Sequence, residues 1–257
     1  MTTPLDRKHS RRVTARRGSP TPDRTRHRYA VRTAPASRSN RFGLHRPPLL
    51  TAAVFSVTAA MGIVQWSIPA LLDELQRRPV GLHGQWWRIA TALVVQDGGI
   101  YGLLSNLAFL AAVGAIAEQV LSRPRWMLQY LGTGLLAELV GYAWQPIGGG
   151  NSIAICGLAA AVAVTAWRRR MPLPPWAPTA VLVWCGGLLA TLWAPLVALG
   201  IAGGVLAGVD TRDGRPVAAP VLFSLVATGV ILAMACNIHG AALLIGTALA
   251  FTVHRRR

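Results

Sequence analysis

The sequence predicts an all-α polytopic membrane protein with about eight transmembrane helices. Three observations support this fold class. Hydrophobic residues make up 53% of the 257 residues and charged residues only 14%, whereas soluble domains carry about 25% charged residues. The apolar residues form runs long enough to cross a bilayer. Finally, 13 of the 26 Lys and Arg residues lie before residue 48, which separates a basic tail from an apolar body.

Residues 1–47 are rich in Arg, Ser, Thr and Pro and contain two acidic residues, Asp6 and Asp23. Because this segment has little apolar surface to bury, we expect a disordered basic cytoplasmic tail, followed by a transmembrane domain over residues 48–257. Two aromatic residues, Tyr29 and Phe42, are too few to stack on bases, so no nucleic-acid partner is expected. Attraction to anionic lipid and an organelle transit peptide stay open as alternatives.

Seven apolar runs follow the tail. The fifth run contains 33 residues, which is too long for one span of about 20. The Trp193-Ala194-Pro195 sequence at its centre would divide it into Ala177–Trp193 and Ala194–Val209. The runs are Leu49–Leu72, Gly99–Val120, Trp126–Trp144, Ser152–Trp167, Ala177–Val209, Val217–Cys236 and Ile238–Val253.

Charge favours the divided run. With eight spans and a cytoplasmic tail, 23 Lys and Arg residues lie inside and three (Arg77, Arg78 and Arg88) lie outside; with seven spans the counts are 18 and eight. Basic residues concentrate in cytoplasmic loops, so the eight-span arrangement is preferred. It predicts a multi-pass protein of the plasma membrane with both termini in the cytoplasm.

The loop from Asp73 to Gly98 is the one long external loop in this arrangement. It contains Trp86 and Trp87 followed by the short apolar piece Ile89–Val95. That piece is too short to span, so we expect it to lie in the membrane interface, anchored by the tryptophans.

Few polar residues fall inside the predicted spans, where each needs a partner or a function. In the eight-span arrangement Asn106, Glu138, Ser152 and His239 all lie in the outer half of the membrane. A serine and a histidine within reach of each other could act as nucleophile and base, and an asparagine could bind an oxyanion. Each also has a structural interpretation: Ser152 as a helix N-cap, His239 as a hydrogen-bonded interfacial residue and Asn106 as an interhelical contact.

Two further groups of side chains are expected to be structural. Glu118 ends the second span, and an ion pair with Arg123 and Arg125 would explain it. The three cysteines, Cys156, Cys185 and Cys236, lie in or beside apolar runs without the spacing of a zinc site or a disulfide framework. We expect them to be small core residues.

Four segments between Trp87 and Gly240 resemble motifs of the rhomboid family of intramembrane serine proteases, in the same order. Trp87-Arg88 resembles the Trp-Arg pair of the first external loop. Gly102 to Asn106 resembles the second-span motif that reads His, three residues, Asn. Gly150 to Gly157 resembles the Gly-x-Ser-Gly-Ala-x-x-Gly run that opens the nucleophile helix, and Ile238-His239-Gly240 resembles the last-span histidine motif. The resemblance implies a rhomboid-like helical bundle.

The sequence departs from the family pattern at five places. Two lie in the last-span motif, where Ile238 stands in place of Ala and Ala242 in place of Gly. Gly102 replaces the histidine of the second-span motif, which removes one expected oxyanion donor. Ile153 replaces the glycine after the serine. The two spans predicted within Ala177–Val209 are an extra pair between the serine helix and the histidine helix.

The resemblance implies a protease that cleaves transmembrane substrates near the outer membrane face through a dyad of Ser152 and His239. Asn106 and the backbone N–H of Ser152 would bind the oxyanion, the Gly148–Gly150 loop with Gly150 would flank the access route, and Glu138 is a candidate replacement for the missing donor. No metal or organic cofactor is needed, and the implied partners are transmembrane proteins and the bilayer. The alternative is a catalytically inactive rhomboid-like protein that binds transmembrane helices.

Overall fold

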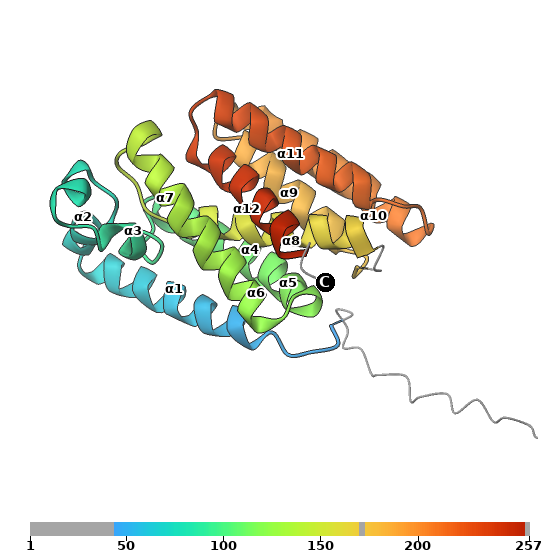
Figure 1. Cartoon of the computed structure of the whole chain (residues 1–257), viewed down its shortest axis with the longest axis horizontal. Helices are drawn as coiled ribbons and strands as arrows, with labels where there is room; N and C mark the ends of the chain where they lie inside the picture. Colours follow the sequence, from blue (N-terminus) through green and yellow to red (C-terminus); the bar gives the residue numbers. More distant parts are fainter. Residues whose placement is uncertain (1–43, 170–172, 255–257) are drawn as a thin grey trace, which may run out of the picture. The chain divides into compact units, whose positions relative to one another are not determined.

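The computed structural model describes residues 44–169 and 173–254, and within these ranges the chain is helical and contains no β-strand (Figure 1). Most of the predicted basic tail therefore lies outside the described residues. The elements are α1 (Leu49–Ser67), α2 (Ala70–Leu75), η1 (Pro79–His83), α3 (Arg88–Thr91), α4 (Gly99–Phe109), η2 (Leu110–Gly114), α5 (Ala115–Val120), α6 (Arg123–Met127), η3 (Leu128–Gly132), α7 (Thr133–Trp144), α8 (Ser152–Arg169), α9 (Ala177–Leu189), η4 (Ala194–Leu196), α10 (Val197–Arg212), α11 (Ala218–Met234) and α12 (Ile238–His254).

The long helices confirm an integral membrane protein. Single π-helical turns, η2 and η3, join α4 to α5 and α6 to α7, so that each pair forms one continuous rod. Four helices are long and apolar enough to cross a membrane: Leu49–Ser67, Gly99–Val120, Ser152–Arg169 and Ala194–Arg212. Shorter apolar helices occupy Ala177–Leu189, Ala218–Met234 and Ile238–Thr252.

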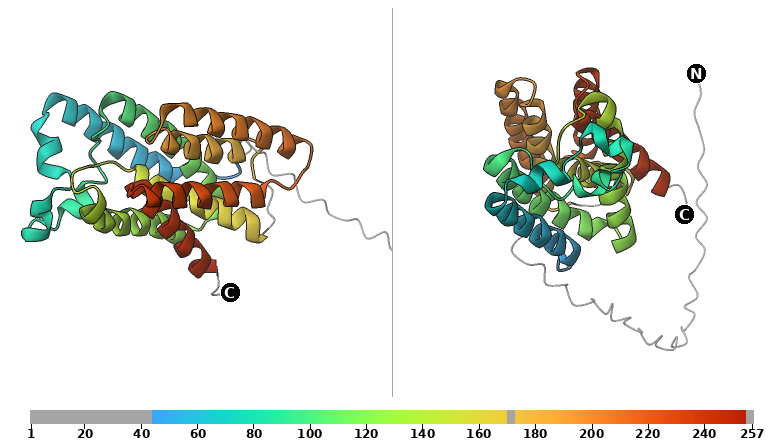
Figure 2. Two further views of the ribbon diagram at one scale, coloured as in Figure 1. Left: turned by 90° about the horizontal axis from the view of Figure 1, so that it is seen from above. Right: turned by 90° about the vertical axis from the view of Figure 1, so that its left-hand side faces the viewer.

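The 33-residue apolar run is divided into two antiparallel helices, α9 and α10. The chain turns at Trp193, whose extended backbone (φ −158°, ψ 115°) precedes Pro195. Gly186 of α9 and Gly200 of α10 lie so close that a Cβ added to either glycine would come within 2.5 Å of the other's Cα. The two helices therefore pack backbone to backbone, and Figure 2 shows them side by side.

The first helix is shorter than the predicted run. It ends at Ser67 instead of Leu72 because Pro69 disfavours helical geometry at the residue before it, and Ile68 has φ −131° and ψ 81°. The apolar piece Ile89–Val95 also differs from the expectation. Its residues Leu93 and Val95 are buried, with Leu93 against Gly134 of α7, so the piece packs partly on protein.

Helix α8 forms the centre of the bundle. Fourteen of its 18 residues are buried, and it packs against α7, α11 and α12 among others. Small residues permit this packing, because a Cβ on Gly246 of α12 would lie 2.8 Å from the Cα of Gly157. The extra pair α9–α10 therefore does not separate α8 from α12, and the two helices stay in direct contact.

Two structural expectations were wrong. Glu118 does not pair with Arg123 and Arg125; its carboxylate accepts the backbone N–H groups of Leu50 (3.1 Å) and Thr51 (2.8 Å) and so caps α1. Cys156 and Cys185 are buried as expected, but Cys236 is exposed. It occupies the turn between α11 and α12, where its φ is positive (52°).

Candidate active site

Ser152 stands at the N-terminus of α8, directly after a loop that the surrounding backbone holds firmly. Gly148 pairs with Arg77 through two backbone hydrogen bonds. Gly149 donates to the Asp97 carboxylate (3.0 Å) and accepts from the Asp97 N–H (3.0 Å), and the N–H of Gly150 donates to Ala92 O (2.8 Å). The loop between α1 and α4 thus fixes the position at which α8 begins.

The side chains of Ser152 and His239 are in direct contact. The Oγ of Ser152 lies 2.9 Å from Nε2 of His239, although 87 residues separate the two in the sequence. Ser152 opens α8 and His239 lies in the first turn of α12, so the close packing of these helices brings the groups together. Both residues are partly exposed. A serine hydroxyl donating to an imidazole nitrogen is the arrangement in which histidine can take the serine proton.

Asn237 holds the other side of the imidazole ring. Its Oδ1 accepts the backbone N–H of His239 (3.0 Å) and lies 2.8 Å from Nδ1 of the same residue. Because the backbone N–H can only donate, the Asn237 atom facing it must be the oxygen, and Nδ1 must carry the proton. Nε2 is then the unprotonated nitrogen, free to accept from Ser152. Asn237 is at once the N-cap of α12 and the residue that sets the histidine tautomer.

This hydrogen-bond chain continues into the extra helix pair. Nδ2 of Asn237 donates to Oγ1 of Thr191 (3.1 Å), and Thr191 in turn donates to the carbonyl of Leu188 at the end of α9 (2.6 Å). Each of these hydrogen bonds from Ser152 to Leu188 then joins one donor to one acceptor. The pair α9–α10 is therefore tied to the histidine as well as to the bundle.

Asn106 belongs to a second polar chain near Ser152. Its Nδ2 donates to Oε1 of Gln96 (2.6 Å), and Nε2 of Gln96 donates to Oδ1 of Asn151 (3.2 Å). These three side chains are buried. Since an amide nitrogen carries two hydrogens, one N–H of Asn106 remains for a further acceptor.

The space between Asn106 and Ser152 is bordered by Gly150. A Cβ on Gly150 would lie 3.6 Å from Nδ2 of Asn106 and 3.7 Å from Oγ of Ser152. A small acceptor such as a carbonyl oxygen would occupy this same region. Glycine at position 150 keeps it open.

Glu138 has a partner that the sequence did not indicate. Its carboxylate forms an ion pair with Nη1 of Arg77, and the two side chains are 1% and 3% exposed. Nε of Arg77 also donates to the carbonyl of Gln145 (2.9 Å). The pair joins the segment after α2 to α7 beside the Gly148–Gly150 loop, so in this arrangement the carboxylate of Glu138 is paired with Arg77.

Gly102 and Ile153, two of the departures from the family pattern, have different surroundings. A Cβ on Gly102 would meet nothing within 4 Å, so the place of the usual histidine is open space one turn from Asn106. Ile153 is 2% exposed and packs in the hydrophobic core. Its side chain therefore faces the bundle.

Several functional residues were missed by the sequence reasoning. Asn237 lies two residues before the histidine motif at a helix start, which was an available signal. Gln96, Thr191 and Arg77 lie in loops or at helix ends that no local pattern links to the site. Among the described residues, no cluster of three His, Cys, Asp or Glu side chains could hold a metal ion.

Comparison with known proteins identifies the family. The family model for the Rhomboid domain matches residues 83–256. A protein of Bacillus subtilis (strain 168) named "Putative rhomboid protease YdcA" is 29% identical over 65 residues, which cover 25% of this chain and 32% of that protein. The matched part thus spans about a third of the curated relative. No solved structure gives a significant match. Since the Rhomboid model covers more than half of the sequence, the chain belongs to the rhomboid family.

Proposed function

We propose that the protein is an intramembrane serine protease that cleaves transmembrane proteins near the outer membrane face. The observation that carries the proposal is the 2.9 Å contact between Ser152 Oγ and His239 Nε2. The orientation of the imidazole by Asn237 supports it, because a serine is activated when a fixed base accepts its proton.

In the first step the Oγ of Ser152 attacks the carbonyl carbon of the scissile peptide, and its proton moves to Nε2 of His239. The tetrahedral intermediate then collapses, the C–N bond breaks, and Nε2 returns the proton to the leaving amine. Water attacks the resulting ester with His239 again as base, which releases the carboxyl product and regenerates the serine. No charged third residue is required.

Asn237 takes the position next to Nδ1 that a carboxylate fills in Ser-His-Asp enzymes. It fixes the ring orientation and keeps the proton on Nδ1. Since an amide is neutral, it supplies less stabilisation to the imidazolium than a carboxylate would. We therefore expect slower turnover than from a triad with Asp.

The oxyanion would be bound by the free N–H of Asn106 and the backbone N–H of Ser152. The latter belongs to the first turn of α8, where N–H groups have no intrahelical acceptor. Removing one donor from such a site typically costs about 10²–10³ in kcat. With glycine at position 102, the site contains one side-chain donor fewer than the family pattern.

The open space at Gly102 favours the second candidate function, a catalytically inactive relative that binds transmembrane helices. Both candidates share the bundle, the bilayer and transmembrane clients. They differ in whether Ser152 reacts.

A fluorophosphonate probe separates the two. Purified full-length protein should be labelled, and labelling should disappear in both Ser152→Ala and His239→Ala. Ser105→Ala, an exposed serine of α4, is the matched control and should keep full labelling. Labelling that survives in Ser152→Ala would refute the assignment. Absence of labelling in the parent, with an active rhomboid labelled in parallel, would favour the inactive relative.

A further inference from the structure

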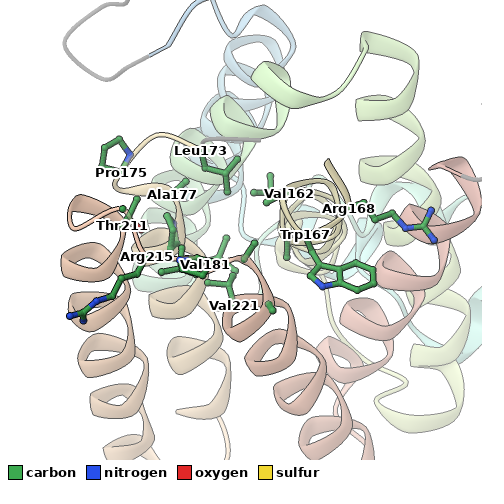
Figure 3. Close-up of a pocket in the computed structure, with 18 residues that line it drawn as sticks. Val162, Trp167, Arg168, Leu173, Pro175, Ala177, Val181, Thr211, Arg215 and Val221 are labelled. Carbon is green, nitrogen blue, oxygen red and sulfur yellow. The ribbon is translucent and has the colours of Figure 1, made fainter. Parts of the chain in front are cut away.

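A large cavity lies at the end of α8 remote from Ser152. It has a volume of about 1040 Å³ and is bordered by the ends of α8, α9, α10 and α11 (Figure 3). Ligand sites usually measure about 300–1,000 Å³, so the cavity is large enough for a sizeable ligand. Ser152 and Arg168 are 16 residues apart on α8, which corresponds to ~24 Å of helix. The cavity is therefore separate from the candidate active site.

The wall of this cavity is mainly apolar. Val162 of α8, Val181 of α9 and Val221 of α11 line it, together with Leu173 and Pro175 from the segment before α9. Water is held poorly by such a surface, because apolar cavities offer it no hydrogen-bond partners. In a bilayer the natural occupant of an apolar space between helices is a hydrocarbon chain.

The margin of the cavity carries positive charge. Arg168 and Arg215 both line it, and Figure 3 shows them on opposite sides of the apolar centre with their guanidinium groups directed outward, at the rim of the cavity. Arg168 lies over the ring of Phe251 (4.7 Å) and donates to the Phe251 carbonyl (3.4 Å), while Arg215 pairs with Asp210 (2.7 Å). A guanidinium has five N–H donors, so these contacts leave several on each arginine for an anion.

The neighbourhood is positive overall. Arg169 and Arg212 lie beside the two lining arginines, whereas the nearby acidic residues in the sequence are Asp210 and Asp213. Trp167 also lines the cavity, next to Arg168. A tryptophan and arginines at a helix end are typical of the headgroup level, and arginines gather on the cytoplasmic side, where anionic lipids are enriched.

We propose that this cavity binds an anionic phospholipid, with its acyl chains against the apolar wall and its phosphate at the arginine-bearing margin. Hydrocarbon explains the apolar lining, and a phosphate explains the arginines, which form strong charge-assisted hydrogen bonds to phosphate oxygens. The acyl chains of a zwitterionic lipid would fit the apolar wall equally well. Its headgroup has no net charge, so the arginines would attract it less. The site therefore selects by headgroup charge.

Native mass spectrometry tests this headgroup preference. The full-length protein in detergent is mixed with equimolar dioleoyl phosphatidylglycerol and dioleoyl phosphatidylcholine, and the lipid that it retains is identified. The chains are identical, so any preference reports on the headgroup. We expect the anionic lipid to be retained at least about fivefold more than the zwitterionic one, as attraction by one arginine would give. The double variant Arg168→Gln/Arg215→Gln should reduce this preference to about one.

The matched control is Arg169→Gln/Arg212→Gln, which removes the same charge from exposed positions that do not line the cavity. It should keep the preference. Ala219→Phe, at an exposed lining residue, should lower the retention of both lipids by filling the cavity. Equal retention of the two lipids by the parent, or an equal loss of preference in both double variants, would overturn the proposal.

Discussion

Replacing Asn237 by alanine should slow catalysis far more than it weakens substrate binding. The substitution removes the only described acceptor for Nδ1 of His239 and the cap of its backbone N–H. The imidazole would then be free to rotate or to carry its proton on Nε2, where it could not accept the serine proton. Because Asn237 contacts the base and not the space for substrate, KM should stay within about twofold.

The magnitude follows from the bonds that are lost. A net hydrogen bond contributes about 0.5–1.5 kcal/mol, and ~1.4 kcal/mol corresponds to a factor of ten in rate. Loss of one to two bonds to the histidine predicts a fall in kcat of about 10–100-fold. Asn237→Asp keeps the acceptor and should retain much more activity than Asn237→Ala.

Thr191 provides a second test of the same chain from outside the site. Thr191→Val removes the acceptor of Asn237 Nδ2 (3.1 Å) and should lower kcat by about 3–10-fold, within the value of one hydrogen bond. Thr179→Val is the matched control, since Thr179 belongs to the same helix pair but donates to Gly204 O (2.7 Å), away from Asn237. The kcat of both variants is measured from the cleavage of a model transmembrane substrate in proteoliposomes. Activity of Asn237→Ala within twofold of the parent would refute this account of the histidine.

Three further perturbations test neighbouring features, each by kinetics and thermal unfolding of the purified variant. Gly102→His places a donor in space with no atom within 4 Å and should raise kcat by up to about 10²; unchanged activity would argue against an oxyanion site here. Gly150→Ala puts a methyl between the serine and Asn106 and should lower kcat/KM at least about tenfold. Because Gly150 has a positive φ of 157°, which strains an alanine, Tm should also fall; unchanged kcat/KM would contradict this account of the space between the two side chains. Arg77→Met leaves the buried Glu138 unpaired and should destabilise the protein by about 3–5 kcal/mol, whereas a loss below 1 kcal/mol would contradict a structural function for the pair.

Much of the fold could be predicted from the sequence, because the bilayer imposes simple rules on length, apolarity and charge. The division of the run Ala177–Val209 followed from its length and its Pro195, and the structure has helices α9 and α10 there. The charge distribution between the spans predicted that Ser152 and His239 lie at the same level of the membrane. Their contact also depends on the close packing at Gly157 and Gly246, which hydropathy does not report.

The supporting residues could not be predicted, because they act across long sequence separations. Arg77 and Glu138 are 61 residues apart, and Gln96 and Asn151 are 55 apart. Nothing in the local sequence of either partner specifies the other. Glu118 illustrates the same limit: charge suggested a basic partner, but the acceptor was used by the first backbone N–H groups of α1.

The most direct test of the central claim is cleavage of a transmembrane substrate by the protein reconstituted in liposomes, followed by mass measurement of the products. The account predicts one cut near the outer end of the substrate helix, made by the parent and by Ser105→Ala, and none by Ser152→Ala or His239→Ala. Identical products from the parent and Ser152→Ala would contradict the account, because another group would then perform the reaction. The account would also be contradicted if the parent protein is stable but cleaves no substrate, while an active rhomboid cleaves the same substrate in parallel.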